Sequence, residues 1–142
     1  MRARYERHSH ADFLKSQISH FKIYAMFDFQ KLEVYQKAKT FNREITDLLR
    51  SRNFDRVTND QLRRASFSIM LNIAEGSSRF SNRDRKNFLV ISRGSAFECV
   101  AILEYLVENK EITESDFDRF YGMLDEISRM LYSLIKRLEG SK

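Results

Sequence analysis

The stretch LRRASFSIMLNIAEG, residues 62–76, decides the fold of this chain. Four of its apolar residues recur at the three-to-four spacing of one buried helical stripe: Leu62, Ala65, Ile69 and Ile73. Other apolar residues lie well outside that stripe, among them Phe67, Met70 and Leu71. A helix that is apolar on nearly every side must be buried on every side, which a small domain does not achieve for one of its own helices. We therefore expect Phe67, Met70 and Leu71 to contact another copy or a partner chain.

Outward from this stretch, the pattern favours a wholly helical chain. The sequence has no proline and only four glycines, and its apolar periodicity predicts helices over about residues 29–51, 61–76 and 82–109, followed by a fourth that starts at Thr113 or Ser115. The expected caps are one residue of 58–60 for the second helix and Ser81 or Asn82 for the third. Because the loops are short, neighbouring helices should be antiparallel, giving an all-α, up-down-up-down four-helix bundle.

Two glycines carry specific expectations. Gly76 follows the last periodic residue of the second helix, so we expect it to end that helix in the left-handed conformation. Gly94 lies inside the third helix, where we expect it to allow close packing of a neighbouring helix.

Length and composition divide the chain into an extension and one domain. Of 142 residues, 1–25 hold all three histidines and five basic against two acidic residues, and we expect a variable extension that forms a short helix or none. Residues 26–142 are the expected domain. No segment approaches the roughly 18 apolar residues of a membrane span. The single cysteine, Cys99, stands among apolar residues and is expected to be a packed thiol in a cytoplasmic protein.

A basic cluster marks the expected turn between the second and third helices. Phe80 stands there among the cations Arg79, Arg83, Arg85 and Lys86, and Arg63 is added from the second helix. Guanidinium groups suit phosphate, and an exposed aromatic ring stacks on a base, so this pattern is typical of RNA or single-stranded DNA binding. The alternative is a solvated helix start with ion pairs inside the chain.

A second polar set stands beside apolar residues in the expected helix interiors: Arg64, Asn72, Glu75 and Arg93. A charge in such a position needs a partner, so Glu75 should pair with Arg93 or Arg64. We interpret the set as a structural network that fixes helix register or subunit contact, with a binding or catalytic constellation as the alternative.

No pattern of catalytic residues favours an enzyme. No histidine follows residue 20, and we expect neither a catalytic residue, nor a metal site, nor a cofactor. Arg4 and His10 have a spacing that is similar to that of some helical ribonucleases, which leaves a nuclease as a weaker alternative.

The deciding stretch also resembles a known family. It is similar to the L-R-R-A-x-x-S-I-x-x-N-I-A-E-G helix of the small bacterial four-helix-bundle proteins encoded in intervening sequences of 23S rRNA genes. The resemblance continues in residues 32–38 and 88–98 and spans about residues 27–139. One departure is visible: Met70-Leu71 stands where the family usually has Pro-Ser, so the second helix should lack a kink.

The resemblance implies more than the residues do. It implies a homopentameric ring, and a related branch comprises accessory proteins of diversity-generating retroelements, which bind a reverse transcriptase and its RNA. We therefore expect a non-catalytic oligomer that binds structured RNA or single strands. The alternative is an assembly protein whose partner is a protein such as a reverse transcriptase.

Overall fold

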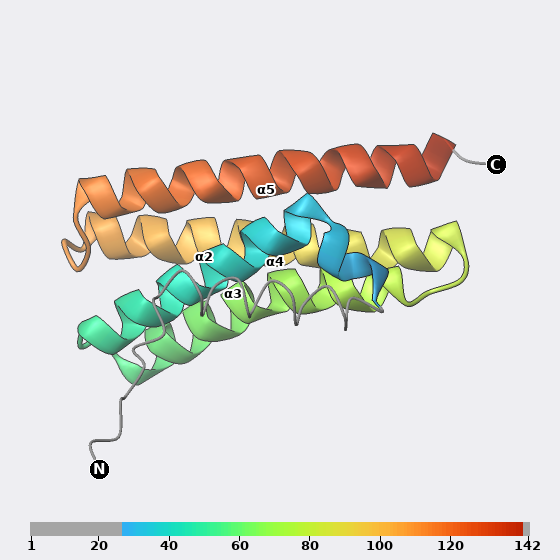
Figure 1. Ribbon diagram of the computed structural model, residues 1–142. Coiled ribbons are helices and arrows are strands. Elements are labelled where there is room, and N and C mark those ends of the chain that lie inside the picture. Colours follow the sequence, from blue (N-terminus) through green and yellow to red (C-terminus); the bar gives the residue numbers. More distant parts are fainter. Residues whose placement is uncertain (1–26, 141–142) are drawn as a thin grey trace, which may run out of the picture.

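The computed structural model describes residues 27–140, and this part of the chain is all-α, with four α-helices and no strand (Figure 1). A short 3-10 helix, η1 (Asp28–Lys31), comes first. The α-helices follow in the order α2 (Glu33–Ser51), α3 (Arg56–Ser77), α4 (Asn82–Glu108) and α5 (Glu114–Gly140). The expectation for residues 1–25 lies outside the described residues. Among those described, no helix is both long and apolar enough to cross a membrane.

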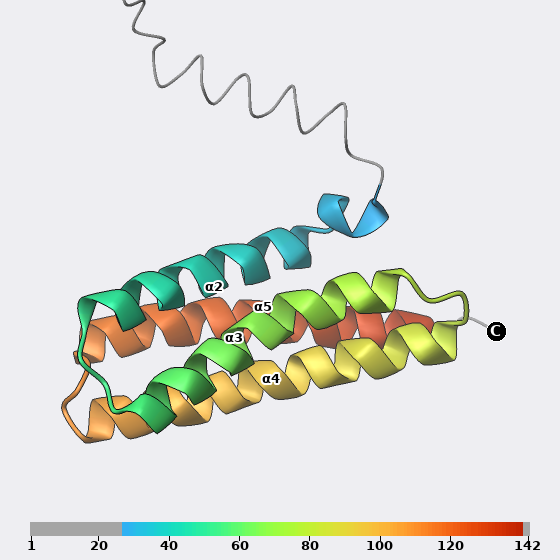
Figure 2. The ribbon, with the colours of Figure 1, turned by 90° about the horizontal axis from the view of Figure 1, so that it is seen from below.

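The four helices lie side by side (Figures 1 and 2). The turns that join α2 to α3 and α4 to α5 lie at one end of the molecule, and the turn that joins α3 to α4 lies at the other. Helix α4 packs between α3 and α5, whereas α2 packs chiefly on α3 and more sparsely on α5.

All four helices contribute to one apolar core. The largest fully buried side chains include Phe41 of α2, Ile69 of α3, Leu103 of α4 and Phe120 of α5. The rings of Phe41 and Phe120 meet edge to face with centroids 6.0 Å apart, which ties α2 to α5. The stripe predicted for α3 is buried as expected, because Leu62, Ile69 and Ile73 are at most 1% exposed.

The helix starts follow local hydrogen bonds. Ser81 caps α4 by accepting from the backbone N–H of Asp84 at 3.1 Å, and Thr113 caps α5 in the same way through Asp116 at 3.0 Å, both as predicted. The cap predicted for α3 at residues 58–60 is wrong. Asp55 caps this helix, because its carboxylate accepts from both the backbone and the hydroxyl of Thr58.

The first predicted helix is interrupted near its start. Leu32 is extended, with φ −71° and ψ 124°, and separates η1 from α2. The side chain of Leu32 packs against the core. Gln36 holds the bend by donating from its side-chain amide to the carbonyl of Gln30 at 2.9 Å. The helix predicted from Phe29 is therefore divided at Leu32 into η1 and α2.

The expectations for the two glycines are both wrong. Gly76 lies within α3, and no described glycine has a positive φ. A Cβ on Gly76 would lie 3.1 Å from the Cβ of Phe88 and 3.2 Å from the carbonyl oxygen of Arg85, so this glycine allows α4 to approach α3 closely. A Cβ on Gly94 would meet nothing within 4 Å. Helix α3 runs without interruption past Met70 and Leu71, in keeping with the absence of proline.

Candidate nucleic-acid interface

Most cations of the predicted basic turn have partners inside the chain. Arg79 pairs with Glu75 one helical turn earlier, and its guanidinium lies 4.6 Å from the centre of the Phe88 ring. Arg85 donates from Nε to the carbonyl of Arg79 at 2.7 Å, and Lys86 lies 3.6 Å from Glu139 of α5. The alternative interpretation, of a helix start with internal ion pairs, therefore describes much of this turn.

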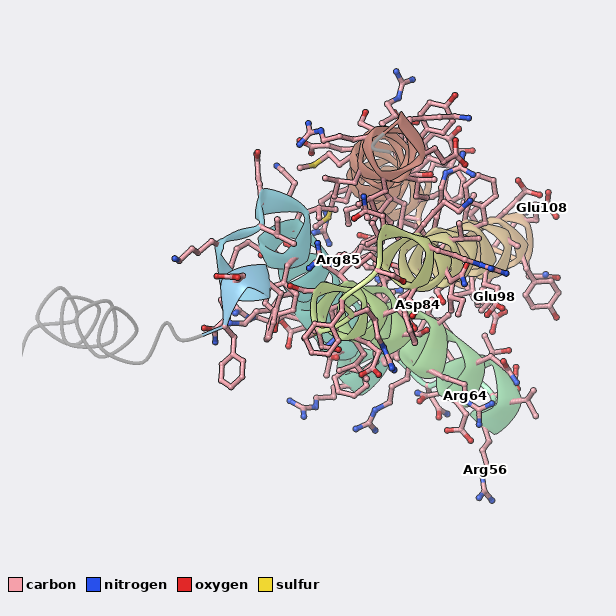
Figure 3. All side chains as sticks on the ribbon, turned by 90° about the vertical axis from the view of Figure 1, so that its right-hand side faces the viewer. Arg56, Arg64, Asp84, Arg85, Glu98 and Glu108 are labelled. Atoms are coloured by element: carbon pink, nitrogen blue, oxygen red, sulfur yellow. The ribbon has the colours of Figure 1, made fainter. Side chains whose placement is uncertain are left out.

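Two residues of the turn remain available to a ligand. Phe80 is 100% exposed, and Arg83 is exposed with no side-chain partner among the described residues. Figure 3 shows that Arg85, in contrast, lies between the helices. It lines a cavity with Asp28 of η1 and Arg137 of α5. The exposed tip of the turn is thus Phe80 with Arg83.

Helix α3 presents further cations away from the turn. Arg63 and Arg64 are exposed, and within residues 27–140 neither side chain makes an ion pair or hydrogen bond. In Figure 3, Arg64 and Arg56 project outward from α3, whereas Glu98 and Glu108 project from α4. Arg64 therefore does not belong to an internal network.

The predicted polar network of Arg64, Asn72, Glu75 and Arg93 is wrong. Glu75 pairs with Arg79, and the Arg93 guanidinium lies against the rings of Phe97 and Tyr132, at 4.6 and 5.7 Å. The reason is the rotation of α4 about its axis, which turns Arg93 toward Tyr132 of α5.

A smaller network takes its place between α3 and α4. Asn72 donates to the hydroxyl of Ser68 at 2.9 Å, and Ser68 shares a 2.8 Å hydrogen bond with Ser95 of α4. Ser92 is fully buried and donates to the carbonyl of Ile69 at 2.7 Å. These short side chains set the register of the helix pair, placing residue 68 opposite residue 95.

The predicted contact residues of α3 divide into two groups. Phe67 and Leu71 are 47% and 46% exposed, as a contact with a second chain requires. Met70 is partly buried and packs against the core of its own chain, so less of this side chain is available to a second chain. On α4, Val90 and Ile91 are also about half exposed. The Ser68–Ser95 hydrogen bond sets Ile91 level with Asn72, and we call the half-exposed apolar residues of these two packed helices the patch Leu71–Val90–Ile91.

A groove between α2 and α3 was missed by sequence reasoning. It has a volume of about 320 Å³ and is lined by Asn42, Thr46, Asp60, Arg63, Arg64 and Phe67. Ser66 of α3 is buried and donates to the Asn42 amide oxygen at 3.0 Å. The available signal was the polar pair Asn42 and Thr46, four residues apart on α2.

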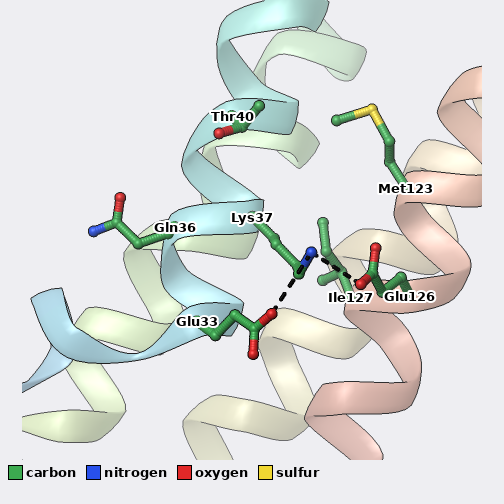
Figure 4. A pocket seen from close by; sticks show the side chains of 7 residues that line it. All are labelled: Glu33, Gln36, Lys37, Thr40, Met123, Glu126 and Ile127. Carbon is green, nitrogen blue, oxygen red and sulfur yellow. Dashed lines mark ion pairs between the residues drawn. The ribbon is translucent and has the colours of Figure 1, made fainter.

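A second groove lies between α2 and α5 and is spanned by ion pairs (Figure 4). The Lys37 ammonium is 2.9 Å from Glu126 and 3.8 Å from Glu33, and the hydrogen bond to Glu126 raises the pKa of Lys37. Further along the same seam, Arg119 lies 2.9 Å from Glu44. Since its charges satisfy one another, this groove offers less to a charged ligand.

Groups with metal-binding or nucleophilic chemistry are sparse in the described part of the chain. Within residues 27–140, no three His, Cys, Asp or Glu residues are placed to hold a metal ion. Cys99 is fully buried, as predicted, and burial raises the pKa of its thiol to about 12. The thiolate is therefore scarce at neutral pH.

These features define an all-α, four-helix protein with a basic and aromatic surface on α3 and the turn that follows it. A family model described as 23S rRNA-intervening sequence protein matches residues 30–133. The chain belongs to this family.

A solved structure is similar to this fold. It is described as a protein of unknown function from the S23 ribosomal protein family of Bacteroides thetaiotaomicron, solved at 1.70 Å. The two chains share 29% sequence identity with a TM-score of 0.70, over 72% of this chain and 98% of the other. No curated protein matches the sequence.

Proposed function

We propose that this protein is a cytoplasmic, non-catalytic oligomer, an antiparallel bundle that binds RNA or single-stranded DNA, as an accessory of an rRNA intervening sequence or a retroelement. The observation that carries the nucleic-acid assignment is Phe80, a fully exposed aromatic ring at the tip of the α3–α4 turn. Its side chain contributes nothing to the core. Arg83 lies three residues away, exposed and without a partner among the described residues. A ring that stacks on a base beside a cation that meets phosphate is the arrangement used by single-strand binders.

The test is a salt titration of binding to labelled 20-nucleotide U and dT strands. Because Arg85 and Lys86 serve the fold, the informative variants are Phe80→Ala and Arg83→Ala. Loss of one phosphate contact should weaken binding to both strands equally and lower the slope of log K against log salt by about 0.7. Loss of the stacked ring should weaken binding by about tenfold.

Arg129→Ala is the control. This arginine lies on α5, pairs with Asp125 at 3.0 Å and is largely exposed, so its removal changes the net charge equally at a remote position. Binding by Phe80→Ala and Arg83→Ala that matches the control at every salt concentration would show that the turn is not a contact surface.

The patch Leu71–Val90–Ile91 supports the proposed self-association. Exposed apolar side chains on two adjacent helices are typical of an interaction surface. A second copy that places its α4 on this α3 would bury these side chains, and a head-to-tail contact of this kind generates a ring where the rotation between copies closes, for which we propose five copies. A partner protein such as a reverse transcriptase is the alternative occupant of the same patch.

A further inference from the structure

We infer that the groove between α2 and α3 is a second contact site for a single strand, where Arg63 and Arg64 bind phosphate and Phe67 stacks on a base. The inference rests on the proposed nucleic-acid function and extends it from the turn to a separate surface. The groove has a volume of about 320 Å³, at the lower end of ligand-site volumes, which suits one nucleotide rather than a globular partner.

The first argument is the availability of charge. At the α3–α4 turn, Arg79 and Lys86 are each paired with a glutamate. In the groove, neither Arg63 nor Arg64 has a side-chain partner in the part of the chain that the structure describes. A guanidinium without an internal carboxylate presents its full charge and all its donors to a phosphate.

The second argument is the placement of Phe67. It follows Arg63 and Arg64 by four and three residues, so all three side chains lie within one turn of α3 and line the same groove. The ring is 47% exposed. A flat apolar face beside two guanidinium groups matches the alternation of base and phosphate along a strand. An acidic peptide would use the arginines but has no group that requires the ring.

The third argument is a polar donor on the opposite wall. Ser66 donates to the Asn42 oxygen at 3.0 Å, and this bond orients the amide. The Asn42 nitrogen makes no hydrogen bond within residues 27–140, so a donor remains for a base edge or a phosphate oxygen.

One carboxylate of the groove would repel a bound phosphate. Asp60 lines the groove and lies 3.9 Å from Arg56. Its charge lowers the positive potential of the site, so neutralising it should strengthen strand binding while freeing Arg56. Asp125 on α5 supplies a matched comparison, because it is likewise paired to an arginine four residues away.

The experiment measures the anisotropy of labelled U20 and dT20 strands with the full chain. Arg63→Ala/Arg64→Ala should bind both strands about tenfold more weakly, and its salt slope should fall by about 1.4 for two lost phosphate contacts. Phe67→Ala should lose about tenfold, and Phe67→Tyr should restore binding because it retains a ring. Asp60→Asn should bind more tightly than Asp125→Asn. Circular dichroism and melting of each variant establish that the fold is retained, as expected for exposed side chains.

The outcomes separate this inference from the proposed function. Normal binding by Arg63→Ala/Arg64→Ala, with loss in Phe80→Ala and Arg83→Ala, would overturn the groove and leave the function in place. Absence of strand binding by the wild-type chain would overturn both. An oligoglutamate peptide that binds the wild type more tightly than U20, and loses binding in the double arginine variant, would show that the groove takes an acidic protein segment and would overturn the nucleic-acid assignment.

Discussion

Gly76 and Gly94 both lie inside helices, but one is closely packed and the other faces open space. At Gly76 the nearest atoms include the backbone carbonyl of Arg85, which belongs to α4 and moves only if the helix moves. At Gly94 the space beyond the helix surface is open, and the missing side chain only lowers helix propensity. The same substitution should therefore change stability in opposite directions at the two sites.

Gly76→Ala should destabilise the fold by about 1 kcal/mol, because overpacking against Phe88 and Arg85 exceeds the gain in helix propensity. Gly94→Ala should stabilise it by about 0.5–1 kcal/mol. Urea unfolding of both variants and the wild type measures the difference. Equal changes in the two midpoints would show that the close approach at Gly76 has no energetic consequence.

At the residue scale, the sequence predicts which side chains are buried better than it predicts which residue a charged side chain pairs with. The spacing of Leu62, Ile69 and Ile73 predicts their burial correctly because a helical period alone determines which residues share a face. The partner of Glu75 depends instead on how α4 is rotated about its axis. That rotation follows from the packing of the whole helix pair, including the hydrogen bond between Ser68 and Ser95, and no local spacing reports it.

At the scale of one element, the start of α3 depends on Asp55. Hydrogen bonds from the side chain and the backbone of Thr58 lower the pKa of this carboxyl below its ordinary value of 3.8. A carboxyl with a lowered pKa in the folded state adds stability above its unfolded pKa and loses that contribution as the pH falls through the folded value. The contribution of Asp55 is therefore complete at neutral pH, begins to fall below about pH 3.8, and is lost once the pH is below the lower pKa of the folded state.

Asp55→Ala should accordingly lower the melting temperature at pH 7 by a few degrees, and the difference from wild type should shrink as the pH is reduced below 4. Asp118→Ala is the comparison, since Asp118 is an exposed carboxylate of α5 that caps no helix. Melting curves from pH 2 to pH 7 measure both. A constant difference between Asp55→Ala and wild type over that range would contradict the assignment of the cap.

Helix boundaries are predictable where a local hydrogen bond sets them and are not predictable where tertiary packing sets them. The starts of α4 and α5 are predictable because Ser81 and Thr113 bond to residues three positions ahead. The break at Leu32 is not, because it accompanies the packing of Leu32 against residues of the core that are distant in the sequence. Asp55 precedes the predicted cap of α3 by three to five residues, and the helix takes an additional turn that carries no apolar stripe.

At the scale of the whole molecule, the sequence predicts the candidate site only in part. Charge and aromatic content at Arg79–Lys86 point to the turn, yet the structure leaves only Arg83 and Phe80 free there. Glu139, which engages Lys86, is more than fifty residues away in the sequence, so its effect follows only from the packing of α5 on α4. The groove with Arg63 and Arg64 likewise requires α2 and α3 to be side by side before its walls exist.

Self-association is the whole-molecule consequence of the patch Leu71–Val90–Ile91. A charge placed at Leu71 should break the contact without disturbing the core, because this side chain is 46% exposed in the single chain. We expect the wild type to have about five times the chain mass of 17.0 kDa by light scattering after size exclusion, and Leu71→Asp to have a mass near that of one chain.

Val57→Asp is the matched control, since Val57 is an exposed apolar residue of the same helix, 69% exposed and outside the patch. This variant should keep the mass of the wild type, and both variants should retain full helicity. A wild type of single-chain mass at micromolar concentration would contradict self-association. A Leu71→Asp variant that stays oligomeric would place the contact on another face, and the half-exposed apolar residues between α4 and α5, Phe97 and Tyr121, would then be the next surface to substitute.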